Sequence, residues 1–123
     1  VSFLAYASVS VAEDETAACE AARIPVAFIV GGAPPPVLDR HGIDQDRATA
    51  VGDAVSAGEF GDAGAAVTDA MLDAFCMAGT PETVADRFDA ILDHADGIVA
   101  AAPLGPDVEA AVELSADALD RVR

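Results

Sequence analysis

Residues 75–107, FCMAGTPETVADRFDAILDHADGIVAAAPLGPD, decide the predicted fold. The stretch opens with an uninterrupted apolar run at 75–78 and closes with a second one at 98–102. Apolar runs without alternation are typical of strands that are covered on both faces. Between them, residues 81–96 place apolar side chains on one helical face and carboxylates on the other. The stretch therefore predicts two adjacent parallel strands joined by a right-handed helical crossover.

Three neighbouring residues mark the start of this helix. Thr80 can cap it, Pro81 suits its first position, and Glu82 supplies a carboxylate to the first turn. Because Gly79 and Thr80 stand at a helix N-terminus, the backbone there can also hold an anion such as a phosphate or a carboxylate. The two roles are compatible, and the cap is the simpler interpretation.

The rest of the chain supplies one more strand and a series of helices. Residues 3–11 are mostly apolar and predict a strand, and the acidic cluster at 13–15 suits the N-terminus of a following helix. Pro25 is expected to kink or break that helix, and the apolar residues after it fit either a strand or a helix. Further helices are predicted at 37–41, 44–57, 61–74 and from 106–107 onward, which makes residues 34–74 a helical insertion.

The composition excludes several classes of protein. The 123 residues carry 22 carboxylates and six basic side chains, all arginine, for a formal net charge of −16. Such a charge repels the phosphates of nucleic acids, and no apolar run is long enough to span a membrane. We expect a cytoplasmic protein. Because 53% of the residues are apolar, we expect a folded chain whose surface carboxylates are screened by concentrated salt, not a disordered one.

No residue pattern identifies a nucleophile, a phosphate-binding loop or a metal site. Cys19 and Cys76 lack a second Cys or a His at metal-ligand spacing, so we expect two reduced, buried thiols and no metal. His41 stands away from the ends of the predicted strands and is interpreted as a structural or surface residue. His94 lies at the end of a predicted helix, where the helix dipole favours a positive charge, and is interpreted as structural. No catalytic residue can be named from the sequence.

Three phrases of the sequence resemble one family in the same order. They are FLAYASVSVAEDE at 3–15, VAFIVGGAPPPVLDRHGID at 26–44, and AGTPE followed by a helix, a strand and PLGPD at 78–107. Over residues 3–114 the chain resembles the luciferase-like α/β-barrel oxidoreductases. Within that group it most resembles the coenzyme F420-dependent 5,10-methylenetetrahydromethanopterin reductases, in a form from a salt-loving archaeon.

The resemblance implies an α/β fold in which residues 1–123 are the C-terminal segment of one luciferase-like TIM (β/α)8 barrel domain. Such a barrel needs roughly 250 residues, so the three parallel strands are assigned to barrel strands six to eight. It also implies that residues 26–30 are helical. Three strands alone leave open edges and an uncovered face. The expected partners are therefore the remaining N-terminal part of the barrel and, in a homo-oligomer, further copies.

The resemblance also implies a reaction and a place for it. In such barrels the active site lies at the C-terminal ends of the strands, which assigns cofactor binding to Ser8, Gly79, Thr80, Pro103 and Gly105. The loop that begins at Pro103 either lines the mouth of this pocket or simply turns the chain. The implied reaction is hydride transfer between reduced coenzyme F420 and a methylene-tetrahydropterin or methylene-tetrahydrofolate in one-carbon metabolism.

Two alternatives stay open. An FMN-dependent luciferase-like monooxygenase, or another F420-dependent dehydrogenase, keeps the family and changes the cofactor or the reaction. The chain could instead be a non-catalytic acidic module that assembles with a partner through its open sheet edges, with no cofactor and no reaction.

Overall fold

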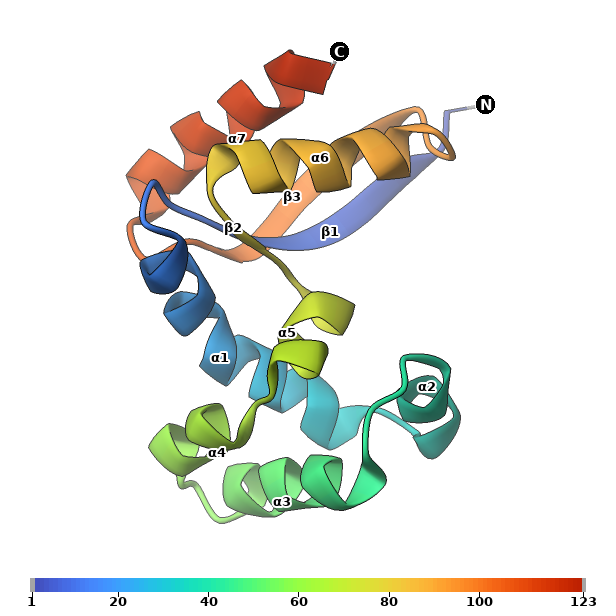
Figure 1. Cartoon of the computed structure of the whole chain (residues 1–123), viewed down its shortest axis with the longest axis vertical. Coiled ribbons are helices and arrows are strands. Elements are labelled where there is room, and N and C mark those ends of the chain that lie inside the picture. Colours follow the sequence, from blue (N-terminus) through green and yellow to red (C-terminus); the bar gives the residue numbers. More distant parts are fainter. Residues whose placement is uncertain (1, 123) are drawn as a thin grey trace. The chain divides into compact units, whose positions relative to one another are not determined.

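The computed structural model describes residues 2–122, which form three strands and seven helices (Figure 1). These elements group into two compact units. The sheet unit comprises the described residues up to Ala22 and from Cys76 onward, and the helical unit comprises Arg23–Phe75. In chain order the elements are β1 (Leu4–Val11), α1 (Glu15–Gly32), α2 (Pro35–Arg40), α3 (Gln45–Ser56), α4 (Phe60–Ala66), α5 (Asp69–Phe75), β2 (Met77–Gly79), α6 (Pro81–Leu92), β3 (Gly97–Leu104) and α7 (Val108–Val122).

The sheet is parallel and has the strand order β2-β1-β3. β1 pairs with β3 from Leu4 opposite Gly97 onward, along most of both strands. On its other edge β1 pairs with β2 only at its carboxyl end, where Val11 lies opposite Gly79. The predicted parallel strands are confirmed, and β1 is the element that joins them.

The prediction that the strands around residues 76 and 99 are neighbours is wrong, because β1 lies between them. The crossover helix α6 contacts all three strands, so it lies across β1 on its way from one edge to the other. A helix with its side chains is about 10–12 Å wide, and neighbouring strands are about 4.8 Å apart. One helix can therefore cover three neighbouring strands. This order also differs from a consecutive run of barrel strands, in which the second strand would be central.

Helices α6 and α7 lie on the same side of the sheet and contact each other (Figure 1). Under them, the buried core is centred on Val9, Val11, Val84 and Phe88. The carboxylates of α6 lie on its exposed side, as its amphipathic pattern predicts. The alternate residues of β1 point to the second face of the sheet, where Tyr6 is 81% exposed. That face is therefore uncovered over the first half of β1.

The ends of α6 follow from local hydrogen bonds. Thr80 caps the helix, because its side chain accepts a hydrogen bond from the backbone N–H of Thr83. The helix ends at Leu92, earlier than predicted, because the chain must turn back toward β1. There Asp96 exchanges hydrogen bonds with Phe3: each backbone N–H donates to the other residue, at 2.6 and 2.7 Å. This pair holds the beginning of β3 beside that of β1.

Pro25 does not break α1, which runs without interruption from Glu15 to Gly32. A proline inside a helix costs one hydrogen bond and some steric strain, about 3 kcal/mol. Burial of Ala22, Val26 and Val30 on one face of the same helix offsets that cost. Residues 26–30 are therefore helical, as the family resemblance implied.

The predicted helix 61–74 is in fact two helices, α4 and α5, separated at Val67 and Thr68. The Thr68 hydroxyl accepts a hydrogen bond from the backbone N–H of Met71, which starts a new helix. The Val67 carbonyl, released from helical bonding, accepts a hydrogen bond from Arg23 at 2.8 Å. Because α5 continues to Phe75, the second strand starts two residues later than predicted, at Met77.

Candidate functional site at the carboxyl ends of the strands

The carboxyl ends of the three strands meet at one edge of the sheet. Val11 lies opposite Gly79, and the backbone N–H of Ala12 donates to the Gly79 carbonyl at 3.2 Å. On the other side Ser10 lies opposite Leu104, the last residue of β3. Five residues were predicted to bind a cofactor. Four of them lie at this edge: Gly79, Thr80, Pro103 and Gly105. Ser8 is on the same face of β1 as Ser10, two residues further from the edge.

Gly105 is fixed by a close backbone approach. It is buried, and a Cβ placed on it would overlap the Val11 carbonyl oxygen and lie 3.0 Å from the Ala111 Cβ. No side chain fits at such distances. Gly105 therefore lets the loop after β3 pack directly on the end of β1, which is sufficient reason for a glycine there.

Gly79 and Thr80 are better explained as a helix entry than as an anion site. Pro81 has no N–H, and the Thr83 N–H is already bonded to Thr80, so the first turn of α6 offers few donors to a ligand. Glu82 adds a negative charge to the same turn. The capping role of Thr80 is confirmed, and its anion-binding role stays a prediction that this geometry does not favour.

Ser8 and Pro103 lie beside an irregularity in β3. Ser8 pairs with Ala101 and Ser10 with Leu104, so β3 carries one extra residue between the two pairs. This is a β-bulge, a feature found next to active sites because it redirects side chains. Leu104 has a left-handed φ of 70°, which a non-glycine residue rarely adopts. Ser8 and Pro103 are both half-buried beside this bulge.

A hollow of about 320 Å³ opens beside these strand ends. Its apolar part comes from Val11, Ala12 and Leu114, and its charged part consists of carboxylates from Glu13, Asp107 and Glu113. Asp107 also accepts a hydrogen bond from the backbone N–H of Ala110 and so caps α7. Glu13 and Glu113 were not predicted from the sequence as lining residues; Glu13 lies two residues after the end of β1, and this position was the available signal. The acidic rim disfavours an anionic ligand in this hollow.

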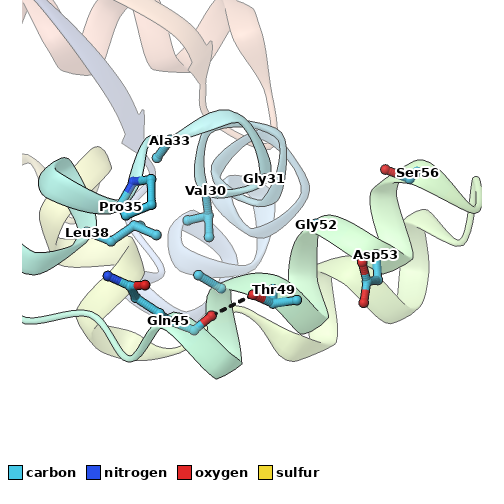
Figure 2. Close-up of a pocket in the computed structure, with 11 residues that line it drawn as sticks. Val30, Gly31, Ala33, Pro35, Leu38, Gln45, Thr49, Gly52, Asp53 and Ser56 are labelled. Atoms are coloured by element: carbon cyan, nitrogen blue, oxygen red, sulfur yellow. Dashed lines mark hydrogen bonds between the residues drawn. The ribbon is translucent and has the colours of Figure 1, made fainter.

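A second hollow of about 320 Å³ lies in the helical unit, between the end of α1, α2 and α3 (Figure 2). Figure 2 shows the Thr49 hydroxyl donating to the Gln45 carbonyl along α3, at 2.8 Å. Near the hollow, α1 and α3 cross closely at Gly31 and Gly52. One carboxylate, Asp53, belongs to its lining, which contains no basic side chain. This combination indicates no particular chemistry.

The cysteines and histidines take structural positions. Cys76 is buried as predicted, whereas Cys19 is only half-buried. Burial raises the pKa of Cys76 to about 11, an effect that the nearby Arg87 partly opposes. The His41 ring lies edge-on to the Phe75 ring, with 5.4 Å between the ring centroids. His94 follows α6 and is exposed. Among residues 2–122, no group of three or more His, Cys, Asp or Glu side chains is arranged to hold a metal ion.

A family model of luciferase-like monooxygenases matches residues 1–99. The chain belongs to the luciferase-like monooxygenase family. Its relatives include the 5,10-methylenetetrahydromethanopterin reductases of Methanopyrus kandleri, 44% identical over 89% of this chain, and of Archaeoglobus fulgidus, 42% identical over 90%. The solved coenzyme F420-dependent tetrahydromethanopterin reductase of Methanopyrus kandleri superimposes with a TM-score of 0.93 at 40% identity, over 98% of this chain.

This luciferase-like chain is shorter than the relatives that it matches. It covers 32% of the Methanopyrus reductase, 35% of the Archaeoglobus reductase and 35% of the solved chain. It therefore spans about a third of their length. Within the described residues, none of the helices is both long and apolar enough to cross a membrane.

Replacing Gly105 by alanine tests the close approach to β1. We expect Gly105→Ala to lower the free energy of unfolding by about 2 kcal/mol, because the new methyl group would overlap the Val11 carbonyl. Urea denaturation measures the change. Gly61→Ala is the matched control: it lies in α4 with open space around it and should stabilise by up to about 1 kcal/mol. Equal tolerance of both substitutions would contradict this explanation of Gly105.

The raised pKa of Cys76 predicts a thiol that reacts slowly. At pH 8, a pKa of about 11 leaves roughly a thousandth of the thiol as the reactive thiolate. In a Cys19→Ser variant, labelling of Cys76 should therefore accelerate about tenfold per pH unit between pH 8 and 10. The control is the same variant unfolded in urea, whose rate should level off near pH 9. A plateau near pH 9 in the folded variant would show that burial does not govern this thiol.

Proposed function

We propose that the chain is the C-terminal part of a barrel oxidoreductase that transfers a hydride between reduced coenzyme F420 and a methylene-tetrahydropterin. The observation that carries this proposal is the match to the solved F420-dependent reductase, with a TM-score of 0.93 over 98% of the chain. At 40% identity the likeness extends beyond the general fold. The substrate is proposed from the names of the relatives, and a methylene-tetrahydrofolate is the related possibility in one-carbon metabolism.

The open surfaces of the sheet support a larger barrel. β2 covers only the last three residues of β1 on its edge, which leaves the N-terminal part of that edge open to a further strand. On the uncovered face, Leu4 and Tyr6 are 54% and 81% exposed. Apolar side chains at this exposure are stabilised when a further layer covers them. We propose that the remaining N-terminal part of the barrel is the partner that provides both the further strand and the layer that covers Leu4 and Tyr6. Residues 34–74 would then be a helical insertion in this barrel.

The residues at the strand ends suit part of the cofactor. When bound, coenzyme F420 supplies the hydride chemistry, and the protein positions it. Ser8 offers a hydroxyl, and Ala101 and Pro103 are small or rigid neighbours beside the bulge, which suits contact with an uncharged ring. The acidic hollow and the entry of α6 do not suit a phosphate or a carboxylate tail. We therefore propose that Ser8, Pro103 and the loop at Gly105 contact or position the ring of the coenzyme. Gly79 and Thr80 would contribute indirectly, by starting α6 at the strand ends.

An FMN-dependent monooxygenase is the second candidate, since the matching family model describes luciferase-like monooxygenases. The absorbance spectrum of the purified holoenzyme distinguishes coenzyme F420 from FMN.

The acidic surface, with a net charge of −16, supports a haloarchaeal source and function at high salt. Nothing at the strand ends favours the non-catalytic module over an enzyme.

The reaction is tested with the full-length protein that contains this chain. We expect F420 reduction or oxidation that depends on methylene-tetrahydromethanopterin or methylene-tetrahydrofolate, measured by the absorbance of the deazaflavin. Ser8→Ala should raise the KM for the coenzyme several-fold without changing the fold, because it removes a hydroxyl beside the ring. The control is Ser56→Ala, an exposed serine of α3. Activity with neither carrier would refute the proposed substrates, and bound FMN would refute the proposed coenzyme.

A further inference from the structure

Leu104, the last residue of β3, has a backbone conformation that leucine rarely adopts. Its φ is 70°, and among residues 2–122 it is the only non-glycine residue with a positive φ. A side chain in this left-handed region crowds its own backbone, whereas glycine occupies the region without strain. Strained residues of this kind cluster at functional sites, where the surrounding structure holds them in place. Leu104 lies beside the proposed coenzyme site.

The packing of the Leu104 side chain shows what holds this conformation. The side chain packs against the buried core under α6 and α7, together with Ile98 and Ala100 of the same strand. Its pairing partner Ser10 follows the core residue Val9 in β1, so Ser10 points to the opposite face of the sheet. Residues that pair directly in a regular sheet point to the same face. Leu104 departs from this rule because the bulge shifts its register while its left-handed backbone directs the side chain to the core.

The conformation of Leu104 determines the backbone on both sides of it. Before it, Ala102 and Pro103 form the bulge, two residues opposite the single residue Val9. Pro103 has no N–H to donate to the ladder, so the bulge depends on its neighbours for its shape. After it, Gly105 is buried against the end of β1. Leu104 is therefore the residue through which both the bulge and the following loop are attached to the core.

We propose that Leu104 is a positioning residue for the coenzyme. Its core-packed side chain and its left-handed backbone together hold the bulge that presents Pro103 to the coenzyme ring. This inference rests on the proposed function, in which Ser8 and Pro103 contact the ring beside the bulge. Leu104 acts from the core, through Pro103. The position needs a backbone that accepts a positive φ as well as an apolar side chain, and substitutions can remove these two properties separately.

Two substitutions in the full-length protein that contains this chain separate backbone conformation from packing. Leu104→Ile keeps the apolar volume, but a β-branched side chain disfavours the left-handed region, so the bulge must rearrange. We expect the dissociation constant for coenzyme F420, measured by deazaflavin fluorescence, to rise about tenfold, the scale of one misplaced contact. Leu104→Asn accepts a positive φ and should keep this constant within about threefold, although it lowers the urea midpoint.

This order distinguishes positioning from a purely structural role. If only packing mattered, asparagine would be the more damaging substitution, because it places an amide against the core. Loss of folded protein lowers the amount of coenzyme bound at saturation and leaves the dissociation constant of the folded remainder unchanged. Leu119→Ile is the matched control, because Leu119 packs against the same core from the helical backbone of α7. Its dissociation constant should stay within about twofold of the wild type.

The possible results decide the inference separately from the proposed function. If Leu104→Ile does not fold, Leu104→Val takes its place, with the same branching and less bulk. Equal affinities of Leu104→Ile and Leu119→Ile, or weaker binding by Leu104→Asn than by Leu104→Ile, would overturn the inference and leave the proposed function intact. A wild-type protein that binds FMN instead would overturn the proposed coenzyme, and the same comparison made with FMN would then decide the role of Leu104. Binding of neither coenzyme would overturn both.

Discussion

The pairing of β1 with both other strands is the constraint on which the sheet unit depends. β2 and β3 do not pair with each other; each reaches the sheet only through an edge of β1. The same strand buries Val9 and Val11 under α6 and α7, so its register fixes the helices as well. Its last carbonyl also determines how closely the loop at Gly105 can pack. Hydrogen bonding, core packing and the candidate site therefore meet on eight consecutive residues.

The second face of β1 explains why a larger protein is proposed. A parallel strand is normally covered on both sides, and its continuous apolar sequence reflects this. Here one face is covered, while Tyr6 on the other is almost fully exposed. The chain spans about a third of the length of relatives that are named reductases. The exposed face of β1 and the length of these relatives are the two observations that support our proposal of a larger barrel enzyme.

Local sequence predicted the elements better than it predicted their neighbours. The cap at Thr80 and the amphipathic face of α6 depend on residues a few positions apart, and both are confirmed. The position of β1 between β2 and β3 depends on pairing across some 90 residues, as between Leu4 and Gly97, which no local pattern encodes. Pro25 was misjudged for a related reason, because burial elsewhere on α1 decides whether the helix survives a proline.

The candidate site shows the same division. Its place at the strand ends was implied by the family resemblance, and the sequence marks where each apolar run stops. The character of each residue did not follow. In the sequence, Gly105 belongs to a loop that either lines a pocket or turns the chain, and only its close packing against the Val11 carbonyl shows why a glycine is needed there.

Interstrand nuclear Overhauser effects measure the order of the strands directly. If β1 is central, contacts between backbone protons should connect Tyr6 with Val99 and, separately, Ser10 with Ala78. Backbone contacts between Ala78 and Val99, without contacts from either to β1, would contradict this account of the fold and of the site built on it.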